Sequence, residues 1–232
     1  MAQRSLLSRL WYRVLRRVCQ LTAVLVFGLR HWGRENIPAE GGVLVVANHQ
    51  SNLDPPLVGM GCFRRMNYVA RLTLFGFAPF RWLINSLDAI PIDQEGIGLS
   101  GMKESLRRLK RGEMVLIFPE GSRTLDGRIA PFMPGFTALA VRSKASILPV
   151  AIEGAFDAWP RTRRFPRPAT IHVRYAPPIL PGEIERLDER ELLAEVERRV
   201  RRCHEQLRGH PLFAPGRQSP GQIEGQQRHF GT

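Results

Sequence analysis

The 232-residue sequence contains only three cysteines, and no two of them form a Cys-x-x-Cys pair. Cys19, Cys62 and Cys203 are odd in number and far apart, so neither a disulfide framework nor a cysteine-based metal site is expected. This pattern favours a reducing, cytosolic compartment. We therefore expect no cysteine-held metal ion, and we also expect no bound cofactor.

Acidic residues are also scarce, since 21 Asp and Glu stand against 34 Lys and Arg, which gives a formal net charge of +13. Such a balance favours an acidic partner, which could be nucleic acid, an anionic membrane surface, or an acidic protein or ligand. The arginines cluster in an N-terminal helical pattern and in a proline-broken loop at 161–168, and neither resembles a nucleic-acid-binding module. We expect a membrane surface and no nucleic acid. The loop could contact lipid headgroups or an acidic acyl carrier, or be merely solvated.

No uncharged run is long enough to cross a bilayer as one helix. Only twelve residues separate Arg17 from Arg30, whereas about 20 are needed. Residues 1–34 are basic first and apolar later, which predicts a membrane-docking interfacial helix or helical hairpin on the cytoplasmic face of the membrane. A secretory signal has the same layout but needs a small-x-small cleavage site, which we do not find here. An ordinary helix packed on the core is the other alternative.

From residue 35 onward, short apolar runs alternate with helical patterns, which predicts an α/β fold with a mixed or largely parallel sheet flanked by helices. The expected strands are 43–47, 67–71, 89–92, 114–118, 147–152 and 169–175. The expected helices are 55–62, 73–86, 98–110, 135–144 and 183–207. The last helix has an apolar stripe formed by Ile184, Leu187, Leu193, Val196, Val200, Cys203 and Leu207. This domain spans 35–208, and the Pro, Gly and Gln content of 209–232 predicts a disordered tail.

A histidine and an aspartate follow the first expected strand. His49 would emerge at the carboxyl end of the strand 43–47, where open α/β sheets place their ligand crevices. Asp54 precedes two prolines suited to the first turn of a helix, so the turn can fold the carboxylate back onto the imidazole. Asp54 would then orient His49 as a general base for a substrate hydroxyl. The alternative is a helix-capping aspartate and an unrelated loop histidine.

A second polar turn, of sequence FPEGSRT, follows the expected strand 114–118. Together, the NHQSNLD turn and the FPEGSR turn resemble the glycerolipid acyltransferases, especially the 1-acylglycerol-3-phosphate acyltransferases. The resemblance covers about residues 35 to 180 and includes the apolar segment 147–152. It implies that His49 is the general base, that Asp54 is its partner, and that Glu120, Gly121, Ser122 and Arg123 form part of the acceptor site.

Within this resemblance, Arg123 is the candidate to hold an acceptor phosphate, and Arg71 is a second candidate at a position where the family commonly has lysine. Glu120 either orients Arg123 or an acceptor hydroxyl, or braces the turn. Gly121 allows a backbone geometry or a close approach that a Cβ would prevent. Backbone amides between Asn48 and Asn52, or at the following helix start, would stabilise the oxyanion.

Two positions depart from the family pattern. Gln94 stands where an arginine is usual, and Met133 stands where lysine is frequent. The expected function is transfer of a fatty acyl group from acyl-CoA or acyl-carrier protein to a lysophospholipid. The first choice of acceptor is 1-acylglycerol-3-phosphate, which would give phosphatidic acid. An acceptor with another headgroup is the alternative, and a non-catalytic basic membrane-binding protein is a third.

Overall fold

The computed structural model describes residues 21, 23–71, 90–92 and 99–209, with the side chains of 69–71, 90–92 and 99–100 left out. The expected helix 73–86, the expected tail, Gln94 and most of the N-terminal segment therefore lie outside the described residues. Within the described ranges, no helix is both long enough and apolar enough to span a membrane.

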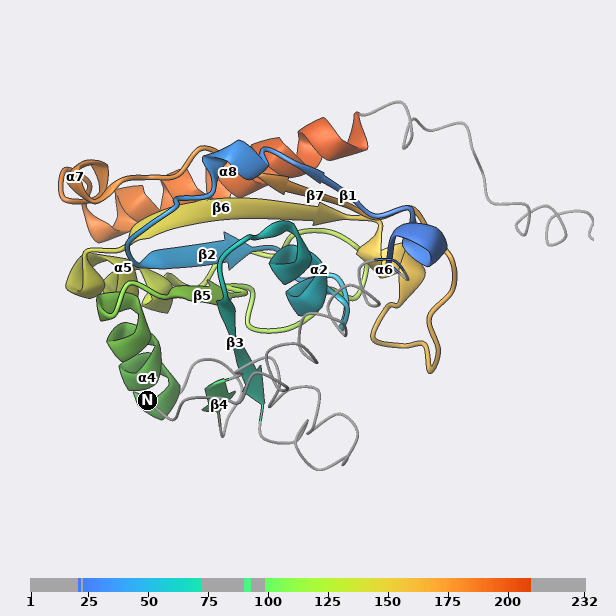
Figure 1. The fold of residues 1–232 in the computed structure, drawn as a ribbon, viewed down its shortest axis with the longest axis horizontal. Coiled ribbons are helices and arrows are strands. Elements are labelled where there is room, and N and C mark those ends of the chain that lie inside the picture. Colours follow the sequence, from blue (N-terminus) through green and yellow to red (C-terminus); the bar gives the residue numbers. More distant parts are fainter. Residues whose placement is uncertain (1–20, 22, 72–89, 93–98, 210–232) are drawn as a thin grey trace, which may run out of the picture.

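A seven-stranded sheet forms the centre of the molecule (Figure 1). Its spatial order is β1-β7-β6-β2-β5-β3-β4, and only the β6–β7 pair is antiparallel. The strands are β1 (Arg30–Trp32), β2 (Val43–Ala47), β3 (Met66–Arg71), β4 (Ile90–Ile92), β5 (Met114–Ile117), β6 (Ser146–Glu153) and β7 (His172–Tyr175). The predicted α/β fold with a mixed, largely parallel sheet is confirmed.

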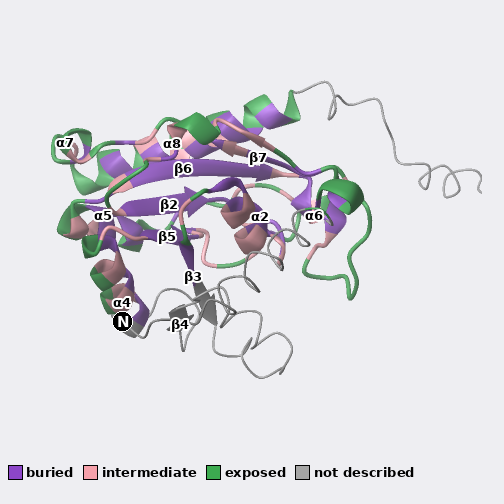
Figure 2. Ribbon diagram, in the orientation of Figure 1, coloured by how far each residue is buried: buried purple, intermediate pink, exposed green. Residues whose placement is uncertain are grey.

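Helices cover both faces of the sheet, which explains why its central strands are apolar throughout. They are η1 (Arg34–Asn36), α2 (Asp54–Gly61), α4 (Leu99–Lys110), η3 (Pro134–Phe136), α5 (Thr137–Ser143), α6 (Ala155–Ala158), α7 (Pro181–Ile184) and α8 (Glu189–Arg208). Alternate β2 residues face opposite layers, because Val45 packs in a cluster with α2 and α6, and Leu44 packs in one with α4, α5 and α8. Figure 2 shows these strands buried between the two layers.

Several elements differ from the sequence prediction. Helix α6 was not expected, the expected helix 135–144 is η3 followed by α5, and the expected strand 169–175 begins only at His172. The two largest differences concern β1 and the last helix. Strand β1 was not expected, because Arg30-His31-Trp32 has no apolar pattern, yet it pairs in parallel with β7. The expected helix 183–207 is divided into α7 and α8, because Asp188 caps α8 in a capping box with Glu191. The break moves Leu192, instead of Leu193, to the fully buried face of α8.

The end of the N-terminal segment joins the edge of the sheet. Residues 23–27 are helical, and the carbonyl of Phe27 accepts a 2.9 Å hydrogen bond from the Ile171 amide. Ala23 and Phe27 are buried, whereas Val24 and Leu25 are 52% and 82% exposed. This short stretch therefore presents apolar side chains both to the core and to the outside.

Candidate active site

The two polar turns identified in the sequence lie at the same edge of the sheet. Strands β2 and β5 are parallel neighbours with Val46 opposite Ile117, so their carboxyl ends lie side by side. The chain leaves these ends at His49 and at Phe118, and the Thr124 amide donates a 2.9 Å hydrogen bond to the His49 carbonyl. The crevice position expected for an α/β sheet is thus occupied by both turns.

His49 and Asp54 are in direct contact. His49 Nδ1 lies 2.8 Å from Asp54 Oδ2, and the same oxygen accepts hydrogen bonds from the amides of Gln50 (2.6 Å) and Ser51 (2.7 Å). Asp54 is fully buried at the start of α2, and the prolines after it occupy the first helical turn, as expected. The carboxylate therefore folds back onto the imidazole as the sequence predicted.

The imidazole of His49 also packs against an aromatic ring, that of Phe118, which sequence reasoning did not single out. Its ring stacks on Phe118, with centroids 3.9 Å apart and planes 14° apart. The side chain of His49 is 18% exposed, and its Nε2 forms no hydrogen bond with any residue in the described ranges. The arrangement leaves this nitrogen as the part of the ring that can receive a proton.

In the turn that follows β2, the side chains of Asn48 and Ser51 form hydrogen bonds with the backbone of other segments. Asn48 extends the β2–β6 pairing by exchanging two hydrogen bonds with the backbone of Ile152, at 2.9 and 2.8 Å. Ser51 Oγ donates to the carbonyl of Trp159 at 2.8 Å, and it also accepts from the Leu53 amide. The short polar residues thus brace the turn that carries His49.

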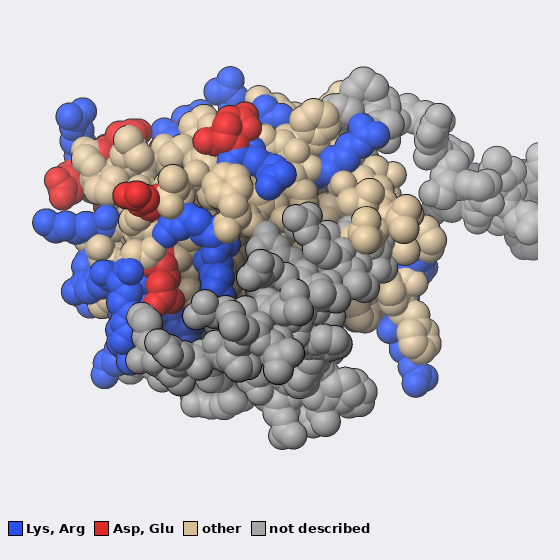
Figure 3. Space-filling view, in the orientation of Figure 1, with Lys and Arg blue, Asp and Glu red and all other residues tan. Residues whose placement is uncertain are grey.

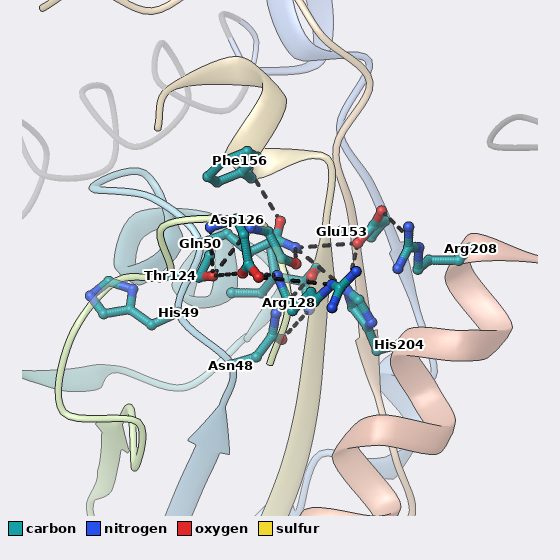
Figure 4. A network of polar contacts seen from close by, with 12 residues as sticks. Asn48, His49, Gln50, Thr124, Asp126, Arg128, Glu153, Phe156, His204 and Arg208 are labelled. Carbon is teal, nitrogen blue, oxygen red and sulfur yellow. Dashed lines mark hydrogen bonds and ion pairs between the residues drawn. The ribbon is translucent and has the colours of Figure 1, made fainter. Parts of the chain in front are cut away.

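A buried polar network behind the turn connects it to the last helix (Figure 4). Gln50 Nε2 donates to Glu153 Oε2 at 3.2 Å, and Gln50 Oε1 accepts from the Phe156 amide at 3.2 Å. His204 Nε2 on α8 lies 2.5 Å from the same Glu153 oxygen, and Arg208 Nε lies 3.6 Å from the other. In Figure 4, His49 and His204 lie on opposite sides of this network. Sequence reasoning missed it, because these residues share no local motif.

Glu120 in the second turn bridges two segments of backbone. Its Oε1 accepts from the His49 amide at 2.7 Å, and its Oε2 accepts from the Ala130 amide at 2.8 Å. Burial raises the pKa of Glu120 to about 7, although the hydrogen bonds from these two amides oppose the shift. Of the two roles expected for Glu120, the bracing role is the one that these contacts display.

Of the remaining predicted site residues, Gly121, Ser122 and Arg123 are described in full, whereas Arg71 is described by its backbone alone. Gly121 has a φ of +71°, and a Cβ there would overlap Met133 Cε, so both expected reasons for a glycine are present. Ser122 is exposed, and Arg123 is half-buried immediately before Thr124, so its backbone adjoins His49. Arg71 ends β3, a parallel neighbour of β5, but its side chain lies outside the described residues.

Most amides expected to serve the oxyanion are already engaged. The amide of His49 donates to Glu120, those of Gln50 and Ser51 donate to Asp54, and that of Asp54 donates to the Ser51 carbonyl. The next two residues are prolines without an N–H group. In the turn between His49 and Asp54, the Asn52 amide alone forms no hydrogen bond with the described part of the chain.

Comparison with known proteins defines the class to which this site belongs. The family model described as "Acyltransferase" matches residues 28–153, which include both turns, strands β1 to β6 and the Gln50–Glu153 contact. The chain belongs to this acyltransferase family.

Particular relatives within the family are 1-acyl-sn-glycerol-3-phosphate acyltransferases. That of Bacillus subtilis is 31% identical over 128 residues, which cover 55% of this chain and 63% of the relative. That of Pseudomonas aeruginosa is 35% identical over 158 residues, which cover 66% and 60%. The chain thus spans about three fifths of the length of these two curated relatives.

A solved structure is also similar over most of the chain. The crystal structure of the 1-acyl-sn-glycerophosphate (LPA) acyltransferase PlsC from Thermotoga maritima superposes with a TM-score of 0.77 at 27% identity. The match covers 90% of this chain and 84% of that one. It therefore extends beyond the two turns to nearly the whole fold.

Proposed function

We propose that this protein transfers a fatty acyl group from an acyl thioester to the free hydroxyl of a lysophospholipid, with 1-acylglycerol-3-phosphate as acceptor and phosphatidic acid as product. The observation that carries the proposal is the buried Asp54 carboxylate 2.8 Å from His49 Nδ1, with Nε2 left open. The names of the bacterial relatives and of the Thermotoga structure support the choice of acceptor.

In the proposed reaction, His49 Nε2 accepts the proton of the acceptor hydroxyl while its oxygen attacks the thioester carbonyl. Asp54 stabilises the imidazolium that forms and holds the ring in place. The Asn52 amide is our candidate for a donor to the tetrahedral oxyanion, because the neighbouring amides are engaged. The C–S bond then breaks, and the proton passes from His49 to the thiolate that leaves.

The donor and the headgroup are the open choices within this proposal. Acyl-CoA and acyl-carrier protein both present the required thioester. Arg123 is the candidate to hold the acceptor phosphate, with Arg71 as the second. Met133, 47% exposed beside Gly121, places an apolar group where many family members have lysine. This observation favours a lyso-lipid with another headgroup as the alternative acceptor.

Membrane association forms part of the proposal, because the acceptor and the product are membrane lipids. The exposed Val24 and Leu25 support docking of the N-terminal segment on an anionic surface at the cytoplasmic face. Replacement of Val24 and Leu25 by serine, which leaves the buried Ala23 and Phe27 and strand β1 in place, is expected to weaken sedimentation with anionic liposomes.

The decisive experiment incubates the purified protein with a panel of lyso-lipids and with either acyl-CoA or acyl-carrier protein, and identifies products by mass spectrometry. We expect a diacyl product from the wild type and none from His49→Ala, which should remain folded by circular dichroism. Appreciable turnover by a folded His49→Ala variant would exclude His49 as the general base. Absence of product with every acceptor would reject the function.

A further inference from the structure

The segment between α6 and β7 concentrates uncompensated positive charge. All residues of 161–168 are exposed, and four of them are arginines. Arg161, Arg163 and Arg164 form no ion pair with any residue in the described ranges. On α8, by contrast, Arg198, Arg199 and Arg201 each pair with a glutamate. Figure 3 shows basic atoms without acidic neighbours at the tip of this loop, at the lower right.

The loop is fixed at its base, so it presents these charges at a defined place. The Arg167 amide donates to the Ala158 carbonyl at 2.9 Å, and Arg167 Nε donates to the Asp157 carbonyl at 2.7 Å. Trp159 Nε1 donates to the Arg163 carbonyl at 2.9 Å, which closes the loop on itself. The exposed side chains of residues 161–166, at the tip of the loop, are therefore the part that can meet another surface.

The loop also presents an exposed aromatic side chain. Phe165 is 68% exposed, with the Arg164 guanidinium 5.3 Å from its ring centroid. The chain after the loop returns beside the N-terminal helical residues, because the Ile171 amide donates to the Phe27 carbonyl. Figure 1 shows the base of the loop next to that stretch, which carries the exposed Val24 and Leu25, while the tip of the loop projects away from it. Arginines beside exposed apolar groups are typical of a surface that rests in a lipid interface.

The same loop is coupled to the catalytic turn. Trp159, which binds the tip through its indole, accepts the 2.8 Å hydrogen bond from Ser51 Oγ through its carbonyl. Ser51 in turn donates its amide to Asp54. A surface that holds the loop would therefore hold the His49 turn at a fixed distance from it.

We propose that residues 161–168 form a docking loop for the surface of an anionic lipid bilayer. The guanidinium groups of Arg161, Arg163 and Arg164 bind lipid phosphates, and the Phe165 ring enters the interface on the same side of the molecule as the exposed apolar residues of the N-terminal stretch. The inference rests on the proposed function, because the docked loop would place the catalytic turn where a lyso-lipid acceptor lies. An acidic acyl carrier is disfavoured, because the exposed aliphatic groups would gain nothing from a charged protein surface.

The test uses the full chain carrying Arg161→Gln, Arg163→Gln and Arg164→Gln. A matched control carries Arg142→Gln on α5, Arg186→Gln between α7 and α8, and Arg190→Gln on α8. All three arginines are exposed, at the other end of the molecule from the loop. Each arginine near an anionic surface contributes about fivefold to partitioning, so the loop variant should bind phosphatidylglycerol vesicles about a hundredfold more weakly. The control should change far less, and binding to phosphatidylcholine vesicles should be weak throughout.

Activity separates the docking role from catalysis. With lyso-lipid embedded in anionic vesicles, the loop variant should lose rate, whereas with a short-chain, monomeric lyso-lipid it should keep the wild-type kcat. Unchanged vesicle binding, or an equal loss in the control variant, overturns the proposal. So does a loss confined to reactions with acyl-carrier protein, which would identify a protein partner. If the wild type acylates no lyso-lipid, the proposed function fails, while the vesicle-binding comparison still tests the loop.

Discussion

Replacement of Asp54 by asparagine separates the charge of the carboxylate from its shape. Three donors converge on Oδ2, namely His49 Nδ1 and the amides of Gln50 and Ser51, whereas Oδ1 has no hydrogen-bond partner in the described part of the chain. An asparagine oxygen will therefore occupy the Oδ2 position, since its amino group would meet two backbone N–H groups there. The ring orientation of His49 is retained, and only the negative charge is lost.

The size of that loss follows from the separation and burial of the pair. The two groups touch at 2.8 Å, and Asp54 is fully buried. Unit charges about 4 Å apart at an effective dielectric constant of about 20 attract by about 4 kcal/mol. Without that attraction to the imidazolium, kcat should fall about a thousandfold, because about 1.4 kcal/mol corresponds to a factor of ten. The amino group left at the Oδ1 position should also cost about 1–3 kcal/mol of stability as an unsatisfied buried donor.

The assay is steady-state acyl transfer with each substrate varied in turn, together with urea unfolding of the same preparations. We expect kcat to fall about a thousandfold with both KM values nearly unchanged, because Asp54 contacts His49 and not the substrates. A folded Asp54→Asn variant with a kcat within tenfold of the wild type would refute the electrostatic role. A large rise in acceptor KM at constant kcat would instead assign Asp54 to binding.

Three further perturbations follow from the second turn and the buried network. Burial raises the pKa of Glu120 from 4.5 to about 7, so the contribution of its protonated carboxyl group to stability is present at low pH and is lost as the pH rises through 7. Between pH 4.5 and pH 8, the free energy of unfolding in urea should therefore fall by about 3 kcal/mol more for the wild type than for Glu120→Gln. Equal pH profiles of the two proteins would contradict this. Gly121→Ala should cost about 1–2 kcal/mol through its positive φ, and Met133→Ala in the same chain should relieve the overlap but not this strain. Glu153→Gln should lower kcat about tenfold at constant KM by loosening the turn before Asp54, whereas Glu195→Gln, which removes an ion-pair partner on the outer face of α8, should leave kcat unchanged.

Local patterns were sufficient for the parts of the fold that face the core. The apolar runs predicted β2 and β5 to within one residue at each end, and Pro55 and Pro56 marked the start of α2. The position of His49 at a strand end, and the return of Asp54 onto it, followed from the same signals, because both depend on contacts only five residues apart. Contacts between residues close together in the sequence could therefore be predicted from the sequence.

Long-range contacts were not readable in the same way. Glu153 and His204 meet Gln50 across 103 and 154 residues of sequence, and nothing in their own segments marks them as partners of the turn. His204 lies beside the apolar stripe of α8, where a histidine reads as an interruption of the pattern. Strand β1 was missed for a related reason, since it is held by its pairing with β7 and not by its own apolar residues.

The contacts around His49 show that its placement does not depend on the residues proposed to bind the acceptor. The first turn fixes its Nδ1 through Asp54, while the second turn fixes its amide through Glu120, its carbonyl through Thr124 and its ring face through Phe118. Each of these contacts joins groups of the protein itself, and none requires a particular headgroup. If His49 is the base, as proposed, it is preorganised before any lipid binds, and selection among acceptors would fall to the rim of the second turn. Variation there, as at Met133, is therefore expected to change KM for the acceptor more than kcat.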